Sequence, residues 1–466
     1  MASCIRSFLI NLPYQLPMPA QRRPLPHSLL DHEELSAGGT LRLLGEAVTT
    51  GLLTGLVIGC LRIAYTHSNS FLASLYAATE FSLLKAGIAL LFVAACALVA
   101  WLCVRIEPLS GGSGIPQVEL ALRGLLPMPW LRIVCCKFVG TLASMCGCLS
   151  LGRAAPSIQM GAAIGCGVGQ LWQDNGLRPR FLNGGAVAGL TACFGAPLAG
   201  ICFAFEELRT SASLPQLLFM SLAAASAWAT TAYILNLGLV FPLNIAAPDW
   251  LSPAELCLIP GISLVSALLC RLYLDGIRLF SGIGDRYLTQ PVRYALIFAT
   301  GFALLMVFSD VIDGFAPSVQ NLAETAYPVR FILVLWLAKF LFNIASGASY
   351  APGGLIMPLL FAGALTGCLM SSLLGLLHYP ASSQLLIPLG MAAFFSGIIR
   401  APFTAAFLIA ETTACWNIFP ALLAASIMTF AITNALGAQP LFTFMRMRQL
   451  RLMRQSQRRA DVQKRA

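Results

Sequence analysis

The chain carries very little charge for its length. Only 10% of its 466 residues are Asp, Glu, Lys or Arg, whereas 58% are hydrophobic. A soluble domain carries about 25% charged residues, because it must cover its surface in water. The scarcity of charge therefore excludes a soluble globular protein and predicts an integral membrane protein.

The chain also lacks the side-chain clusters that catalysis or metal binding requires. Its four histidines form no ligand pair, and its 15 cysteines show no metal-site spacing. We find no nucleophile–base set and no nucleotide-binding loop. We therefore predict no enzyme, no catalytic residue, no metal and no cofactor. Nearly all the cysteines are interpreted as small buried hydrophobic residues.

Long apolar windows predict several membrane-spanning helices, since a span needs about 20 such residues. The windows that reach this length are 45–65, 82–104, 131–151, 216–236, 255–274, 291–309 and 329–345. Several later windows are short or interrupted by Gly and Pro. Broken helices are tolerated at membrane depth where protein or an aqueous cavity satisfies their backbone.

The composition divides the chain into five parts. They are a Pro-rich leader (1–40), two membrane repeats (41–236 and 253–445), a linker (237–252) and a basic tail (446–466). Because cationic segments beside a span stay in the cytoplasm, both termini are expected there. The tail is interpreted as a topology anchor, with contact to anionic lipid as the alternative. The net charge of +10 lies largely in this tail and does not indicate nucleic acid.

One spacing of small residues and proline occurs twice in the same order. Its two copies are Gly152, Pro156, Gly161, Ala162, Gly165 and Gly354, Pro358, Gly363, Ala364, Gly367. A second pair of matches follows: Ala196, Pro197, Glu206 and Ala401, Pro402, Glu411. Ordered matches of this kind predict two homologous halves, which is a common design of membrane transporters.

Three Gly-rich segments each precede a helix within apolar sequence: 110–116, 152–156 and 353–358. Proline suits the first turn of a helix, and the free N–H groups and dipole of a helix start attract anions. Oriented amides without a fixed cation bind weakly enough for release, which conduction requires. Together the segments predict a central anion site made of backbone amides. For 110–116 alone, a plain turn is the alternative.

The carboxylates Glu206 and Glu207 follow an apolar segment. Ionisable residues within a span are functional by default. Because Arg209 follows closely, a solvated pair at a helix end is an equally weighted alternative.

The three segments resemble the signature motifs of the CLC family of chloride channels and proton/chloride exchangers. Residues 112–116 are similar to its GSGIP motif, 152–156 to GREGP and 353–358 to GGxFxP, and the likeness covers residues 41–445. The resemblance implies an all-α fold of the prokaryotic type, with an inverted repeat of two homologous halves and broken, tilted helices. It also implies a homodimer with a separate pore in each subunit. We expect no C-terminal regulatory domain, because the sequence after residue 446 is too short to form one. The dimer interface would involve helices around 194–230 and 401–436.

The resemblance further implies which residues contact the anion. The hydroxyl of Ser113 and the amides of Leu355 and Ile356 would bind it centrally, and an outer site would use amides near Arg153. Serine at 113 is the chloride-type choice of the family, whereas proline is associated with nitrate. The full set implied is Ser113, Gly114, Ile115, Arg153, Ala154, Ala155, Leu355, Ile356 and Phe442.

Two positions depart from the family pattern. The gating glutamate, third in GREGP, is Ala154 here, and a methyl group can neither compete with an anion nor carry a proton. The family's C-terminal tyrosine corresponds to Phe442, which lacks the hydroxyl; the lost hydrogen bond is worth roughly 1.5–3 kcal/mol. The internal proton glutamate is retained as Glu207. Glu119 and Lys137 are expected to be buried polar residues near the pore, with partners that the sequence leaves open.

These observations favour passive transport of chloride and similar anions without obligatory proton coupling, in a bacterial inner membrane. One alternative is a proton/chloride antiporter that uses another carboxylate, although no motif places Glu80, Asp310 or Asp313 near the pore. The other is a transport-dead structural or regulatory membrane dimer. The expected partners are chloride, membrane lipid and a second copy of the chain.

Overall fold

The computed structural model describes residues 37–76, 83–173, 178–241, 243, 252–307, 319–324, 327–379 and 382–451. Most of the predicted leader, most of the linker, residues 452–466 and the acidic residues Glu80, Asp310 and Asp313 lie outside these ranges. Within them the chain is helical, and its only β-type pairing is one isolated bridge. The all-α fold predicted from the sequence is confirmed.

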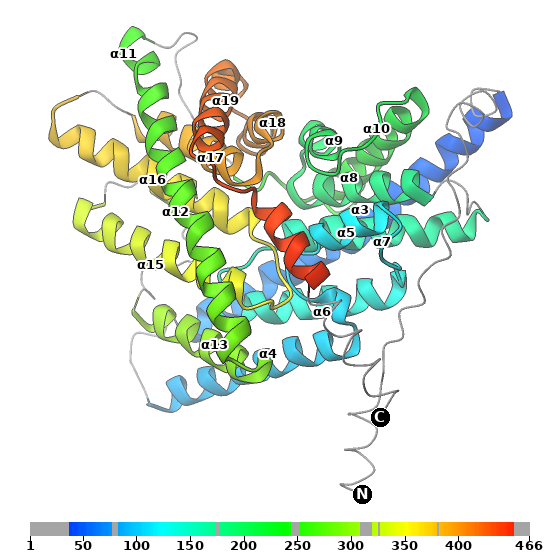
Figure 1. The fold of residues 1–466 in the computed structure, drawn as a ribbon, viewed down its shortest axis with the longest axis horizontal. Helices are drawn as coiled ribbons and strands as arrows, with labels where there is room; N and C mark the ends of the chain where they lie inside the picture. Colours follow the sequence, from blue (N-terminus) through cyan, green and yellow to red (C-terminus); the bar gives the residue numbers. More distant parts are fainter. Residues whose placement is uncertain are drawn as a thin grey trace, which may run out of the picture.

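The first half contains helices α3 to α10 (Figure 1). Their bounds are α3 Ala37–Tyr76, α4 Leu83–Ile106, α5 Ile115–Leu122, α6 Trp130–Cys146, α7 Ala154–Leu171, α8 Arg178–Phe194, α9 Pro197–Glu206 and α10 Leu214–Ala229. A 3-10 turn, Pro108–Ser110, precedes α5, and a π-helical turn, Thr230–Ile234, extends α10.

The second half contains helices α11 to α19. Their bounds are α11 Pro253–Leu256, α12 Leu258–Tyr287, α13 Gln290–Val307, α14 Val319–Glu324, α15 Val329–Ala348, α16 Ile356–Leu376, α17 Ser383–Ile399, α18 Pro402–Thr413 and α19 Phe419–Ala435, with a 3-10 turn Trp416–Ile418 before α19. One more helix, residues 441–451, follows and is called the C-terminal helix below. It crosses the predicted boundary between the second repeat and the tail.

Seven helices in the described ranges are long and apolar enough to cross a membrane: Gly38–Ser68, Ala86–Ile106, Leu214–Ile234, Leu258–Tyr287, Val329–Ala348, Ile356–Leu376 and Trp416–Ala435. Five coincide with predicted windows. Window 131–151 instead forms the 17-residue α6 and window 291–309 the 18-residue α13. Two of the seven, Ile356–Leu376 and Trp416–Ala435, lie outside the predicted windows. Pro358 lies in the first turn of α16, where proline does not interrupt a helix.

The cysteines are less uniformly buried than predicted. Cys60 on α3 and Cys135 on α6 are exposed, and Cys136 is only partly covered. A weakly polar thiol is tolerated on an apolar helix face as well as inside a core. The prediction that nearly all cysteines are buried is therefore wrong for these residues.

The two halves contact one another reciprocally. The backbone N–H of Gly152 donates to the Gly354 oxygen at 2.7 Å, and the N–H of Gly354 donates to the Gly152 oxygen at 2.7 Å. Such exchange of equivalent contacts is what a two-fold axis between similar units produces. The glycines of the repeated spacing serve the same packing: Gly161 on α7 meets Gly185 of α8, and Gly363 on α16 meets Gly390 of α17.

A second reciprocal contact joins the short helices α9 and α18, which lie side by side in Figure 1. The Glu411 carboxylate at the end of α18 accepts from the N–H groups of Leu198 and Ala199 at 3.0 and 2.9 Å. The Glu206 carboxylate at the end of α9 accepts from the N–H groups of Phe403 and Thr404 at 3.0 and 2.7 Å. Each carboxylate thus satisfies the free donors at the start of the other helix, where negative charge is favoured. The interpretation of Glu206 as simply solvated is therefore wrong.

We expect Glu411→Ala to lower the stability of the protein by about 0.5–2 kcal/mol, the range for a lost helix cap. Glu206→Ala should lower the stability at least as much as Glu411→Ala, because the Thr404 hydroxyl also donates to Glu206 at 2.6 Å. Thermal unfolding followed by tryptophan fluorescence in detergent measures both. Glu324→Ala, at an exposed carboxylate on α14, is the control. Melting temperatures equal to the control would show that the reciprocal caps contribute nothing.

Candidate functional site

Three helices start where their preceding loops meet. α5 begins at Ile115, α7 at Ala154 and α16 at Ile356. The Gly152–Gly354 pair joins the loops before α7 and α16. The loop before α5 is tied in by Gly112, whose N–H donates to the Tyr350 oxygen at 3.0 Å and whose oxygen accepts from the Gly353 N–H at 3.2 Å. Backbone contacts therefore bring together the three Gly-rich segments that the sequence singled out.

Glycine is required in these loops because the chains approach so closely. A Cβ on Gly152 would lie 2.5 Å from the Cβ of Met357, and a Cβ on Gly354 would lie 2.7 Å from the Cβ of Ala155. Gly114, the residue before α5, adopts a left-handed φ of 100°, and a Cβ there would lie 2.5 Å from the Gln159 Oε1 atom. The repeated glycines thus set the distance between the starts of α7 and α16.

The first turns of these helices leave backbone donors free. In α7 the first intrahelical bond is from the Ser157 N–H to the Arg153 oxygen, and in α16 it is from the Leu359 N–H to the Leu355 oxygen. Within the described ranges no protein acceptor pairs with the N–H groups of Ala154, Ala155, Leu355 and Ile356. Unpaired amides at a helix start, together with its dipole, form an anion-binding surface.

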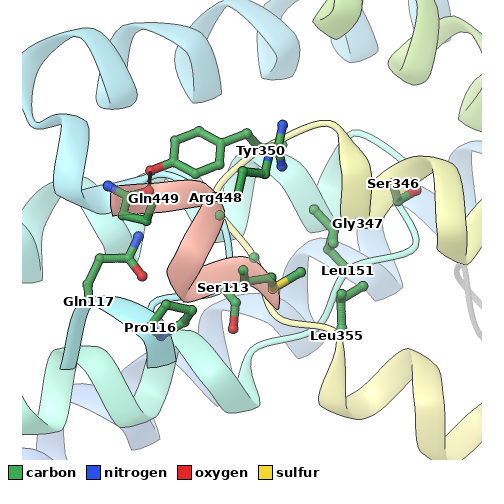
Figure 2. A pocket seen from close by; sticks show the side chains of 14 residues that line it. Ser113, Pro116, Gln117, Leu151, Ser346, Gly347, Tyr350, Leu355, Arg448 and Gln449 are labelled. Carbon is green, nitrogen blue, oxygen red and sulfur yellow. Dashed lines mark hydrogen bonds between the residues drawn. The ribbon is translucent and has the colours of Figure 1, made fainter. Parts of the chain in front are cut away.

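A cavity opens beside the start of α5 (Figure 2). Ser113, which is 5% exposed, lines it together with Leu355 from the start of α16. The Ser113 hydroxyl has no hydrogen-bond partner among the described residues. A buried hydroxyl without a partner is costly, so the group is free to donate to a ligand in the cavity.

The other predicted anion contacts are buried around the same loops. Ile115, Ala154, Ala155 and Ile356 are fully buried at the three helix starts. Phe442 is also fully buried, near the start of the C-terminal helix. It is absent from the lining of the cavity, to which that helix contributes Met445, Arg448 and Gln449 instead.

Lys137 holds the loop before α5 in place. This lysine of α6 is fully buried, and its Nζ donates to the backbone oxygens of Ser110 and Gly112 at 3.0 and 2.6 Å. These partners leave no local pattern in the sequence. Carbonyl groups of the loop that presents Ser113 accept hydrogen bonds from the buried amine, so Lys137 positions that loop.

Glu119 on α5 is paired with Arg446 of the C-terminal helix. Glu119 is 3% exposed, and the half-buried Glu207 at the end of α9 lies within interaction range of it, with Arg446 and Arg209 as the nearby cations. Glu207 is therefore not simply solvated at a helix end. Sequence reasoning missed Arg446, because an ion pair across more than 300 positions leaves no local pattern.

The rest of the C-terminal helix closes one side of the cavity, and it lies near the centre of Figure 1, in red. Arg448 makes two bonds to the Asp285 carboxylate of α12, at 2.8 and 2.7 Å. The hydroxyl of Tyr350 donates to Gln449 at 2.6 Å, the contact dashed in Figure 2. The interpretation of this basic segment as a mere topology anchor is wrong for Arg446 and Arg448, since both pair with carboxylates of the helical domain.

We expect Arg446→Gln to lower stability by roughly 3 kcal/mol, because it leaves the buried Glu119 carboxylate without its cation. The double variant Glu119→Gln/Arg446→Gln should regain part of the loss. Arg451→Gln, an exposed arginine at the end of the same helix, is the matched control. Thermal unfolding in detergent measures the series. A single variant as stable as the control would show that the ion pair does not anchor the helix.

Comparison with known proteins identifies the family. A family model described as "Voltage gated chloride channel" matches residues 95–434. The H(+)/Cl(-) exchange transporter ClcA of Vibrio vulnificus is 28% identical over 425 residues, covering 88% of this chain and 90% of the relative. ClcA of Citrobacter koseri is 29% identical over 422 residues, covering 86% of this chain and 88% of the relative.

Solved structures share the fold. A slow cyanobacterial Cl-/H+ antiporter superposes with a TM-score of 0.80 at 24% identity, over 88% of this chain and 98% of that one. A CLC-type fluoride/proton antiporter superposes with a TM-score of 0.68 at 19% identity, over 86% of this chain and 97% of that one. The family model covers most of the chain and the fold agrees, so this multi-pass integral membrane protein belongs to the CLC family of chloride channels and transporters.

Proposed function

We propose that the protein carries chloride and similar small anions passively, through a pore within each subunit. The observation that carries the proposal is the meeting of three helix starts, two of them with unpaired amides, beside a Ser113 hydroxyl that has no partner among the described residues. Neutral donors of this kind bind an anion without holding it permanently, which repeated passage requires. The family model, described as a chloride channel, supports chloride as the anion.

The absence of obligatory proton coupling follows from Ala154. It is the first residue of α7, fully buried, at the position that the GREGP resemblance gives to the gating glutamate. A carboxylate there can displace an anion when charged and take up a proton when neutral, so it can tie the two movements together. The alanine methyl does neither, and anion passage therefore needs no proton step at this point.

Proton/chloride exchange is the second candidate. The relatives named above are H(+)/Cl(-) exchange transporters. The inner proton residue implied by the resemblance is present as Glu207, and Glu119 lies within its range. Two neighbouring carboxyl groups can share a proton. An exchanger built on them would need a second station in place of Ala154.

The proposed assembly is a homodimer in a bacterial cell membrane, with both termini cytoplasmic. Helices α9, α10, α18 and α19 expose large apolar side chains, including Leu198, Leu217, Phe403 and Ile427, which are 43%, 39%, 47% and 41% exposed. The CLC resemblance assigns this face to a second copy of the chain.

We expect Ala154→Glu to make chloride flux depend on pH. A charged carboxylate at the start of α7 competes with the anion, so flux should fall near pH 7 and recover as the pH decreases. While protonation of the introduced carboxylate limits the flux, each pH unit should change the flux by up to about tenfold. Chloride efflux from liposomes measures this, with Ala154→Gln as the neutral control of similar size. If Ala154→Glu behaved like Ala154→Gln, position 154 would not lie in the anion path.

We expect Ser113→Pro to raise the ratio of nitrate to chloride flux, because the CLC resemblance associates proline at this position with nitrate, and the change removes the hydroxyl that lines the cavity. Ser113→Ala removes the hydroxyl alone and should lower chloride flux without favouring nitrate. Liposome efflux of each anion gives the ratio. An unchanged ratio in Ser113→Pro would remove Ser113 from the selective part of the pathway.

A further inference from the structure

Tyr350, in the loop between α15 and α16, has a backbone conformation that residues with a side chain rarely adopt. Its φ is 66°, in the left-handed region. Its backbone oxygen accepts two hydrogen bonds, from the Gly112 N–H at 3.0 Å and from the Tyr294 hydroxyl of α13 at 3.1 Å. Such a conformation persists only where the surroundings hold it, and it is commonest at functional positions. Tyr350 is not among the residues that the family resemblance assigns to the anion.

The ring of Tyr350 lies against the loop that presents Ser113. A Cβ on Gly111 would lie 2.4 Å from the Cε1 atom of this ring, and a Cβ on Gly112 would lie 3.2 Å from the ring. Glycine at both positions therefore lets the ring pack directly on the loop backbone. Because Ser113 is the next residue in the chain, the backbone and the ring of Tyr350 together hold the segment that carries its hydroxyl.

The hydroxyl of Tyr350 reaches the C-terminal helix. It donates to the Oε1 atom of Gln449, which is 8% exposed, and Figure 2 shows the contact. The guanidinium carbon of Arg448 lies 5.9 Å from the centre of the Tyr350 ring. All three residues line the same cavity as Ser113. A single side chain thus connects the Ser113 loop to the helix that closes one side of the cavity.

The ring and the hydroxyl of Tyr350 do different things. Phenylalanine would fill the same space beside Gly111 and Gly112, so packing on the loop does not need the oxygen. A phenolic hydroxyl has one proton to donate, and Gln449 accepts it at 2.6 Å. That proton is therefore engaged by the C-terminal helix, which favours a role in holding the cavity over direct contact with an anion.

We propose that Tyr350 is a positioning residue, which links the C-terminal helix to Ser113 and so sets how strongly the cavity binds a small anion. A hydroxyl donates well only when it is aimed at its acceptor, so a small displacement of the loop weakens the contact from Ser113. The link reaches the C-terminal helix through Gln449 and not through Phe442, which is absent from the cavity lining. The inference rests on the proposed anion site at Ser113 and adds the residue that holds this donor in place.

Bromide binding to the intact protein tests the inference. Calorimetry gives the affinity, and anomalous scattering from soaked crystals should show a bromide within hydrogen-bonding distance of the Ser113 hydroxyl. Tyr350→Phe keeps the ring and removes the hydroxyl, whereas Gln449→Leu removes its acceptor. Each should weaken bromide binding about two- to tenfold, the range for one lost neutral hydrogen bond. The double variant should bind no more weakly than either single variant, because both remove the same bond.

Two exposed positions provide matched controls. They are Tyr233→Phe, in the π-helical turn after α10, and Gln170→Leu, near the end of α7, and both should bind bromide as the unaltered protein does. Additive losses in the double variant, together with a lower melting temperature, would show a general loss of structure and overturn the inference. Tighter binding in Gln449→Leu would also overturn it, because the released Tyr350 hydroxyl would then contact the anion itself.

Two further results would overturn the inference: no bromide at Ser113 in the unaltered protein, or an unchanged affinity in Tyr350→Phe. The binding measurement needs no transport, so it is independent of the proposed function. Matched, non-additive losses of affinity in a protein that carries no anion flux would support the inference and contradict passive transport. Chloride flux together with an unchanged bromide affinity in Tyr350→Phe would do the reverse.

Discussion

The structure depends on one pair of backbone contacts, between Gly152 and Gly354. Each glycine donates to the other at 2.7 Å, and neither position has room for a Cβ. Because the contact precedes α7 in one half and α16 in the other, it fixes how close the two helix starts come. Every helix start leaves its first N–H groups without an intrahelical partner, and this contact holds the starts that carry the free amides of Ala154, Ala155, Leu355 and Ile356 next to each other. A larger residue at either glycine would separate them.

Charged side chains elsewhere in the protein stabilise the helices and loops around the Gly152–Gly354 contact. Glu206 and Glu411 cap the helices of the opposite half, and Lys137 is bound to the loop that carries Ser113. Arg446 and Arg448 hold the C-terminal helix against α5 and α12. In a chain with so few charges, most of those described near the centre satisfy backbone groups or one another.

The sequence predicted the framework well, because its signals are local. The repeated glycine spacing indicated two halves, and the three Gly-rich segments indicated the helix starts that the structure brings together. The partners of the charged side chains were harder to predict from the sequence. Nothing near Glu119 points to Arg446, since such a contact depends on how distant helices pack. The continuous α16 was also missed, because glycines and Pro358 resembled a break although they lie where a helix tolerates them.

The central claim is that anions cross without obligatory proton movement, because Ala154 replaces a titratable group. Liposomes containing the protein and a chloride gradient, with the membrane potential held near zero, allow chloride efflux and external pH to be followed together. Our account predicts chloride efflux with no accompanying proton movement. Protons driven uphill by the chloride gradient would contradict it and would move the coupling to other carboxylates, with Glu207 and Glu119 first.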